Sequence, residues 1–448
     1  MHQWTETSQA QFGLALSIFE DLISTPKDPK WGADYVDDLV ASIDGSVGST
    51  GRGDREALAL FRDVVLPACR PNDCPMMLSY VPTAPSVSAK ISDALVGVAS
   101  IFAGHWEGGA GAIAAENEAL RWLAGVAHYP ESAGGVFVAG GSAANLSALA
   151  VARKMARERG THGRLAVITG EAAHTSVVGA AELLDMVVFT APGDDKGRLT
   201  GAGVRDAAGR ADAEGCLIVA VVATGGATLT GMVDKLDEIA DFCEETGAWM
   251  HVDAAYGGAG LLLPELSPIF AGFERSDSFG IDPHKWLFTP YDCAALVYRD
   301  PSTARRTFPQ RASYLQEVDR HDQNPSDLAF HLSRRARGLP LWFSLVANGT
   351  EAYEAAVRRT IEVSRAVADA VKADDRMRLV LEPDLSVVLF EVVGWNRQQY
   401  FEWSRRTAAE GRALINPVEF EDRTCLRICV VNPLTDAQAI IALFDDFG

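Results

Sequence analysis

Between residues 135 and 299, short apolar runs alternate with segments of helical spacing. Runs such as Leu217–Ala223 are apolar on both faces, which is typical of strands in a mostly parallel sheet that helices cover on both sides. This alternation predicts an open α/β fold. The expected strands of a seven-stranded sheet are Val136–Ala139, Leu165–Thr169, Val187–Thr190, Leu217–Ala223, Trp249–Asp253, Ser276–Ile281 and Ala294–Tyr298.

Three units are expected along the chain: an N-terminal helical segment over residues 1–85, a large α/β domain over 86–340, and a small C-terminal α/β domain over 341–448. The first boundary falls at residues 80–85, which prolines keep extended. Residues 310–327 are polar and irregular, which is typical of a lid or a mobile loop. Further expected elements are helices over Arg55–Val65, Ala143–Arg159 and Asp234–Thr246, and strands over Ser386–Val393 and Cys425–Val430.

Composition narrows the class of protein. With 448 residues, of which 48% are hydrophobic and 22% charged, the chain matches globular proteins. Its net charge of −20 disfavours nucleic-acid and anionic membrane partners. The apolar runs are too short to span a bilayer, and the start of the sequence shows no secretory signal. Because the 7 cysteines do not form a disulfide framework, we expect a reduced, cytoplasmic protein.

Several common catalytic motifs do not occur in the sequence. The patterns GxGxxG, GxxxxGK[ST], GxSxG and HExxH are absent, which removes the dinucleotide, P-loop, nucleophile-elbow and zinc-protease hypotheses. The pairs Cys69/Cys74 and Cys425/Cys429 lack zinc-ligand spacing, so we expect no metal site. A large α/β enzyme without these motifs is expected to use a carbonyl cofactor.

Lys285 lies in the stretch 282–286, at the end of an expected strand. In a partly dry site, desolvation lowers the pKa of a lysine and favours the neutral, imine-forming amine. The alternative is an ordinary surface lysine. Asp253 ends another strand, where a carboxylate either keeps a heterocyclic nitrogen protonated or caps a helix.

Two further motifs follow strands. The small residues of 140–145 open a helix and form either a phosphate seat or a plain strand–helix turn. His174 either lies flat against a planar cofactor or is a satisfied core histidine. Each motif is weak alone, but all four meet at the carboxyl edge of one sheet, where open α/β folds bind ligands.

With these motifs in this order, the sequence resembles the group II pyridoxal-phosphate-dependent amino-acid decarboxylases, of the aromatic-L-amino-acid and tyrosine decarboxylase type. That family has the aminotransferase fold, fold type I. HVDAAYGG followed about thirty residues later by DPHKW is a specific signature. The matching segments are YVPTAPS (80–86), VAGGSAANLSALAVAR (138–153), EAAHTS (171–176), VVATGGATLTG (221–231), HVDAAYGG (251–258), DPHKWLF (282–288), SRRARGLPLWF (333–343) and LSVVLF (385–390).

The resemblance implies roles for individual residues. Lys285 would hold pyridoxal 5′-phosphate as an internal aldimine, Asp253 would pair with the pyridine nitrogen, and His174 would stack on the ring. Loss of CO2 would leave a quinonoid, and Tyr314 in the irregular segment would protonate Cα. The residues implied in cofactor binding are Gly141, Ser142, Ala143, His174, Thr224, Asp253, Ala255, Asp282, His284 and Lys285. Those implied in substrate binding are Tyr80, Val81, Pro82 and Thr224.

The resemblance also implies a homodimer with shared active sites, acting on an L-amino acid, for which an aromatic side chain is the first expectation. Two departures bear on this. Asp282 stands where many relatives carry asparagine, and a carboxylate near the phosphate is unfavourable unless neighbouring donors compensate. Residues 104–107 differ from a typical aromatic-acid pocket, so an aliphatic or acidic substrate stays open. The basic run Arg334-Arg335-x-Arg337 is interpreted mainly as structural.

Two alternatives stay open on the outcome of the chemistry. The first is an aldehyde synthase of the same fold, in which oxygen intercepts the carbanion and the products are aldehyde, ammonia and peroxide. In the family, tyrosine at the position of Tyr314 accompanies simple protonation and phenylalanine the oxidative outcome, so the sequence favours the amine. The second is a non-catalytic homologue, against which the retention of Lys285, Asp253, His174 and Tyr314 argues.

Overall fold

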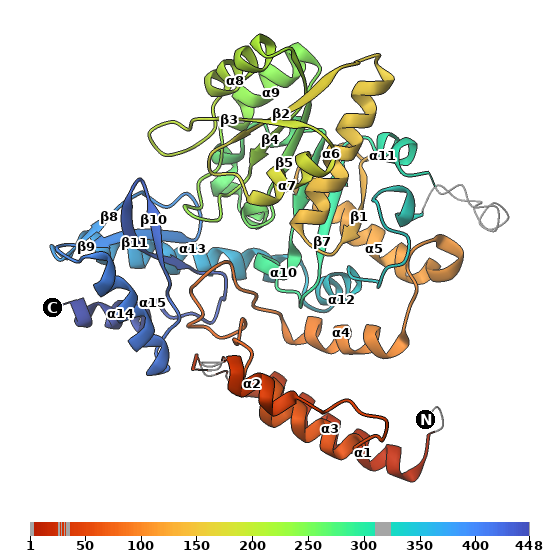
Figure 1. Ribbon diagram of the computed structural model, residues 1–448, viewed down its shortest axis with the longest axis vertical. Helices are drawn as coiled ribbons and strands as arrows, with labels where there is room; N and C mark the ends of the chain where they lie inside the picture. The colour runs from red at the N-terminus through yellow and green to blue at the C-terminus, as the bar shows by residue number, and fades with distance from the viewer. Residues whose placement is uncertain are drawn as a thin grey trace.

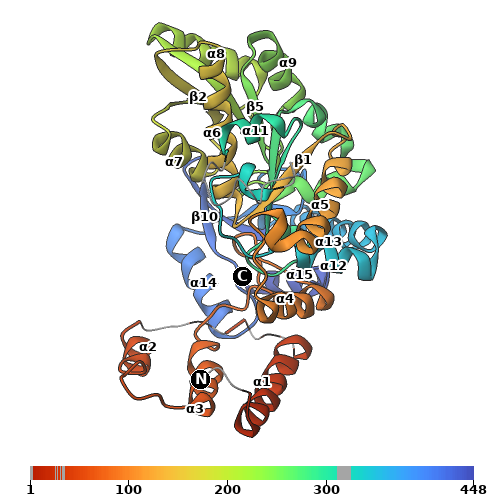
Figure 2. The same cartoon turned by 90° about the vertical axis from the view of Figure 1, so that its right-hand side faces the viewer.

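The computed structural model describes residues 4–25, 27, 29–30, 32, 36–309 and 324–447. It begins with three helices, α1 (Glu6–Ser24), α2 (Val36–Ile43) and α3 (Asp54–Leu60), the last continued by a π-helical turn. A capping box starts α1, because the backbone N–H of Ser8 donates to Thr5 Oγ1 and that of Thr5 donates to Ser8 Oγ. Figures 1 and 2 show these helices at one end of the molecule, beyond α4 (Val87–Ala99).

Seven strands form the main sheet in the order β1-β7-β6-β5-β4-β2-β3. Only β7 is antiparallel to its neighbours, and the remaining pairs are parallel. The mostly parallel seven-stranded sheet is therefore confirmed. The strands are β1 (Gly134–Val138), β2 (Arg164–Gly170), β3 (Val187–Ala191), β4 (Cys216–Thr224), β5 (Trp249–Asp253), β6 (Ser278–Ile281) and β7 (Ala294–Tyr298).

Helices cover both faces of this sheet, as expected. Along β2, alternate side chains enter different cores: Ala166 and Ile168 pack with α5, α8 and α9, whereas Leu165 and Val167 pack with α6 and α7. This is the period of two that a pleated strand imposes. The covering helices are α5 (Trp106–Val126), α6 (Gly141–Glu158), α7 (Thr175–Leu183), α8 (Gly201–Ala213), α9 (Leu236–Thr246) and α11 (Ser302–Thr307).

The C-terminal unit has a four-stranded antiparallel sheet, in the order β10-β11-β9-β8, packed against α13. Buried hydrogen bonds join it to the part of the chain that carries the large sheet, including one from Trp286 Nε1, just after β6, to Thr360 Oγ1 at 2.9 Å. α12 (Leu339–Asn348) precedes this unit and packs against α4 and α5. The elements that follow are α13 (Thr350–Lys372), β8 (Met377–Leu379), β9 (Val387–Val392), α14 (Arg397–Ala409), β10 (Pro417–Phe420), β11 (Arg423–Cys429) and α15 (Ala437–Ile441).

Short turns complete the described chain. The strand expected from Ser276 begins two residues later, because the Ser276 N–H closes the 3₁₀ turn at Phe273–Arg275. Of the segment expected to be irregular, residues 325–327 form a 3₁₀ turn. The other short helices are Gly257–Leu262, Pro264–Phe270, Pro283–Trp286 (α10), Pro325–Asp327 and Ala442–Phe447. Among the described residues, no helix combines the length and apolar character needed to cross a membrane.

Arg334 is fully buried in this fold. Its guanidinium forms a two-pronged ion pair with Glu116 of α5, at 2.6 and 2.7 Å, and donates to the Ala103 carbonyl. Glu116 Oε1 also accepts the backbone N–H of Gly338. Arg334 therefore fastens the segment before α12 to α5, as its structural interpretation predicted.

Candidate active site

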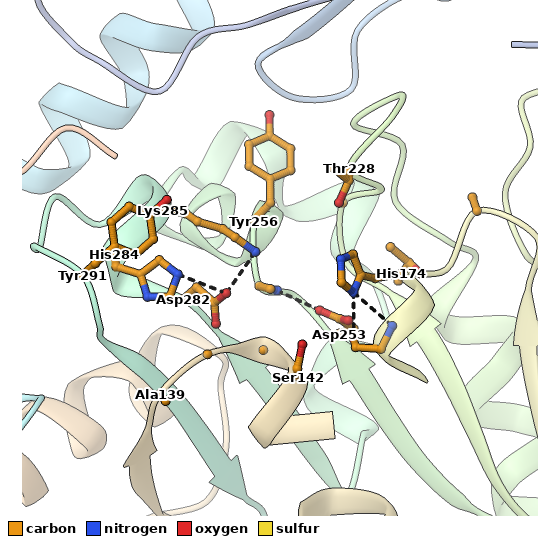
Figure 3. A pocket seen from close by; sticks show the side chains of 17 residues that line it. Ala139, Ser142, His174, Thr228, Asp253, Tyr256, Asp282, His284, Lys285 and Tyr291 are labelled. Carbon is orange, nitrogen blue, oxygen red and sulfur yellow. Dashed lines mark hydrogen bonds and ion pairs between the residues drawn. The ribbon is translucent and has the colours of Figure 1, made fainter. Parts of the chain in front are cut away.

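A cavity of about 300 Å³ opens at the carboxyl ends of the parallel strands, where sequence reasoning placed the site (Figure 3). β4 ends at Thr224, β5 ends at Asp253, and Asp282 follows the end of β6. The predicted residues that line it are Gly141, Ser142, His174, Thr224, Asp253, Ala255, Asp282, His284 and Lys285. One edge of the sheet thus brings together residues that lie far apart in the sequence.

Lys285 faces a buried carboxylate. The short helix α10 starts just after Asp282 and points Lys285 back, so that Nζ lies 2.9 Å from Asp282 Oδ2. Burial alone would lower the pKa of Lys285, but its anionic neighbours, Asp282 first and then Asp253, together outweigh it, and the pKa lies above its ordinary value. The protein alone therefore favours the ammonium form of this lysine.

Asp282 has a second neighbour in the imidazole of His284. His284 Nδ1 accepts the Cys293 N–H, so Nε2 carries the proton in the neutral ring and faces Asp282 Oδ2 at 3.5 Å. Burial lowers the pKa of His284, and Asp282 partly opposes that shift. Asp282 Oδ1 is buried and has no hydrogen-bond partner among the described residues. Lys285 is thus the near cation that compensates this carboxylate, and His284 Nε2 lies farther away.

Asp253 and His174 lie on the other side of the cavity (Figure 3). Asp253 Oδ2 accepts a hydrogen bond from Asn145 Nδ2 at 2.8 Å, and Oδ1 accepts the Ala255 N–H at 3.2 Å. His174 caps α7: its Nδ1 accepts the backbone N–H of Ser176 and lies 2.7 Å from the Ser176 hydroxyl. Both side chains are held by neighbours that belong to the protein.

The N-terminus of α6 borders the cavity between these two groups. Gly140 caps the helix without a side-chain hydrogen bond, so the first N–H groups of an 18-residue helix face outward. A Cβ at Gly141 would lie 3.2 Å from Ala255 Cβ and 3.4 Å from Asp282 Oδ2. Glycine therefore keeps open a space that a side chain would fill. Such a helix end binds phosphate.

Some predicted residues lie elsewhere. Ala143, Val81 and Pro82 are not among the residues that line the cavity, and Tyr80 is 64% exposed. Their contacts with cofactor or substrate stay predictions. Tyr314 lies outside the described residues.

Several lining residues were not predicted. The Tyr291 ring lies tilted against His284, with ring centroids 4.6 Å apart, and Tyr256 reaches the small unit through its hydroxyl, 2.5 Å from Ser386 Oγ. Buried Arg427 donates to the carbonyls of Tyr80 and Thr228, so it ties the predicted substrate stretch to the cavity wall. Tyr256 lies within the motif HVDAAYGG, so the sequence could have indicated it as a site residue. Nothing in the sequence marks Tyr291 or Arg427 as site residues.

The family model described as the pyridoxal-dependent decarboxylase conserved domain matches residues 53–393. The chain belongs to the pyridoxal-dependent decarboxylase family. The decarboxylase is 28% identical over 411 residues to the aromatic-L-amino-acid decarboxylase of Bacillus atrophaeus, across 89% of this chain and 85% of that relative. It is a carboxy-lyase whose cofactor is pyridoxal phosphate.

Solved structures agree with this assignment. The decarboxylase superposes on Oryza sativa TDC with PLP and tryptamine at a TM-score of 0.90 and 23% identity, covering 100% of this chain and 98% of that one. On Rhodiola rosea 4-hydroxyphenylacetaldehyde synthase the TM-score is 0.86 at 22% identity, covering 98% and 96%. At such identities the likeness shows the fold, which is fold type I.

The decarboxylase's cavity fits pyridoxal phosphate on its own geometry. The uncapped start of α6 and the open space at Gly141 would suit the phosphate, and Asp253 would offer a carboxylate to the ring nitrogen. Lys285 supplies an amine to the same cavity.

Proposed function

We propose that this decarboxylase converts an aromatic L-amino acid into its amine and CO2. The observation that carries the proposal is the convergence of Lys285, Asp253, His174 and the start of α6 on one cavity. The aromatic side chain is supported by the name of the Bacillus atrophaeus relative. Among the described lining residues, Lys285 is also the only lysine or arginine, so none is left to neutralise an acidic side chain.

The roles of the residues follow from their chemistry. Bound pyridoxal phosphate supplies an electron sink for the pair that remains when CO2 leaves. Asp253 holds a proton on the pyridine nitrogen, and His174 lies against the ring face. The N–H groups of Gly141 and Ser142 bind the phosphate, with His284 beside them. Lys285 would hold the cofactor through its amine.

Protonation of Cα decides the product, and we assign this step to Tyr314. A tyrosine hydroxyl can donate a proton to Cα in place of the departed CO2, and the product is then the amine. Tyr314→Phe is expected to divert product toward the aldehyde, measured as peroxide and ammonia released per CO2. A variant that still forms only amine would overturn the role of Tyr314.

Substrate class is tested by comparing kcat/KM for aromatic, branched aliphatic and acidic L-amino acids with the cofactor-loaded protein. We expect aromatic acids to exceed the others by at least about tenfold, since one buried apolar group contributes 1–3 kcal/mol of discrimination. A preference for an acidic or aliphatic acid would overturn the aromatic assignment and leave the decarboxylase assignment in place.

We also propose a homodimer. Each protomer consists of the N-terminal segment (residues 1–85), the large domain (86–340) and the small domain (341–448). The N-terminal segment and α4 form the interface with the partner. On α4, Val87, Ile91, Leu95 and Val98 form one apolar stripe, each between 39% and 86% exposed. Phe12 and Leu16 of α1 are likewise about half exposed. An apolar surface of this kind is typical of an interface.

Shared sites give the dimer a functional test. Mixed dimers of a Lys285→Ala protomer with a Tyr314→Phe protomer are expected to regain amine formation, because one site then combines an intact lysine with an intact tyrosine. Heterodimers confirmed by mass spectrometry that form no amine would exclude a loop acting in trans.

All 7 cysteines are free, which supports the proposal of a reduced, cytoplasmic setting.

A further inference from the structure

A continuous set of buried hydrogen bonds lies behind the cavity, and its central residue is Asn145. Asn145 is the fifth residue of α6 and is 1% exposed. Its amide nitrogen donates to Asp253 Oδ2 at 2.8 Å and to Ser176 Oγ at 3.0 Å. Its amide oxygen lies 3.0 Å from His251 Nε2. The side chain therefore uses both donors and its acceptor on protein groups.

The direction of these hydrogen bonds is fixed at both ends. The indole N–H of Trp249 can only donate, and it donates to Ser278 Oγ at 2.9 Å. The Asn145 oxygen can only accept, so His251 Nε2 carries the proton of the neutral ring, and the Ser278 hydroxyl donates to His251 Nδ1 at 2.8 Å. Because an ionised Asp253 can only accept, the amide nitrogen of Asn145 must face it.

The environment keeps His251 in this neutral form. His251 is fully buried on β5, and burial lowers its pKa to about 4, although Asp253 opposes the shift. A protonated His251 would need to donate from both nitrogens, and the Ser278 hydroxyl would then have to turn away. At neutral pH the donor order is therefore unique.

A branch of the same network reaches His174. The Ser176 hydroxyl accepts from Asn145 and donates to His174 Nδ1 at 2.7 Å, while the Ser176 backbone N–H also donates to Nδ1. His174 Nδ1 is thus an acceptor, and Nε2 carries the ring proton. The orientation of one amide consequently determines the contacts of both Asp253 and His174.

We propose that Asn145 is a positioning residue for the cofactor: one N–H holds the Asp253 carboxylate that faces the pyridine nitrogen, and the other, through Ser176, orients the His174 ring. Trp249, Ser278 and His251 hold the amide in the required orientation. This inference rests on the cofactor roles proposed for Asp253 and His174. Asp253 would contact the edge of the cofactor ring and His174 its face. Asn145 positions both side chains and itself touches neither substrate nor cofactor.

Two variants test the proposal. Asn145→Leu removes both donors at similar volume, and we expect pyridoxal phosphate to bind at least about tenfold more weakly, because a hydrogen bond to a charged group is lost. The bound cofactor's absorption change with pH should also move to a higher midpoint. Without the amide donor, the Asp253 carboxylate is held less firmly against the ring nitrogen, and less positive charge stays on the ring.

Asn145→Asp keeps the shape and replaces the amide by a titrating group. Protonated, the new acid can still donate to Asp253; ionised, it repels Asp253. The ratio of the variant's Kd for pyridoxal phosphate to that of the wild type should therefore rise with pH. If Asn145→Leu fails to fold, Asn145→Asp still tests the positioning role of Asn145.

The matched control is Ser147→Ala, on the same helix, which removes a buried hydroxyl without a partner among the described residues. We expect it to bind the cofactor like the wild type. Asn145 variants that match this control in Kd and in pH midpoint would overturn the inference while the proposed function stands. A wild-type protein that shows no cofactor band dependent on Lys285 would instead overturn the proposed function.

Discussion

Lys285 Nζ lies 2.9 Å from Asp282 Oδ2, and this pair links cofactor capture to pH. An imine forms only from the neutral amine, yet the Asp282 carboxylate, 3% exposed, raises the pKa of Lys285 above its ordinary value. The ammonium form persists to higher pH than it would without Asp282. His284, Tyr291 and Asp253 are the other titratable groups beside this pair.

Asp282→Asn is therefore expected to lower the pH midpoint of pyridoxal-phosphate capture by about one unit or more. Loss of the carboxylate lowers the pKa of Lys285, so the neutral amine is populated at lower pH. The measurement is the absorbance of bound cofactor as a function of pH. Asp292→Asn is the control, since Asp292 pairs with Arg337 at 3.0 Å. Equal midpoints in wild type and Asp282→Asn would contradict the assigned coupling.

The buried ion pair between Arg334 and Glu116 is expected to be important for stability. Arg334→Ala leaves Glu116 charged and buried, which costs about 3–5 kcal/mol of unfolding free energy. Arg205→Ala removes an exposed pair with Glu245 and should cost less than about 1 kcal/mol. Urea denaturation measures both values. Similar losses from the two variants would show that burial does not strengthen the Arg334 pair.

His251 makes the fold sensitive to acid. Its pKa in the folded protein is about 4, below the ordinary 6.5, so the unfolded chain binds a proton first as the pH falls. The contribution to unfolding free energy is present above pH 6.5 and is lost progressively toward pH 4. Between pH 7 and pH 5 the loss amounts to about 2 kcal/mol.

His251→Gln tests this dependence, because glutamine keeps an N–H donor for Asn145 but does not titrate. The drop in unfolding free energy from pH 7 to pH 5 should be about 2 kcal/mol smaller in the variant than in the wild type. Parallel pH profiles for the two proteins would show that His251 does not titrate on unfolding.

Much of the fold follows from local sequence because most strands of the large sheet are buried on both faces, the edge strand β3 being the more exposed exception. Each is a short apolar run, and every one was predicted. In the small sheet, β9 and β11 are buried in the same way and were predicted as well. β8 and β10 were missed, because they are edge strands of 3 and 4 residues with few buried side chains.

The site likewise contains residues that could be predicted from the sequence and residues that could not. Asp253 and Asp282 follow strand ends, so their common edge could be predicted from the sequence order. Asn145 and Tyr291 could not, because their importance depends on contacts made after folding. Asn145 reaches Asp253 across 108 positions of sequence, and Tyr291 turns back onto His284. Hydrogen-bond networks of this kind leave no periodic or motif signal.

The central claim is that this chain removes CO2 from an amino acid and returns the amine. Its most direct test is mass-spectrometric product analysis of the cofactor-loaded protein in air, against the common L-amino acids, with Lys285→Ala as the blank. We expect equal amounts of amine and CO2 from an aromatic acid, and neither from the blank. Aldehyde with ammonia and peroxide, or no CO2 above the blank, would contradict it.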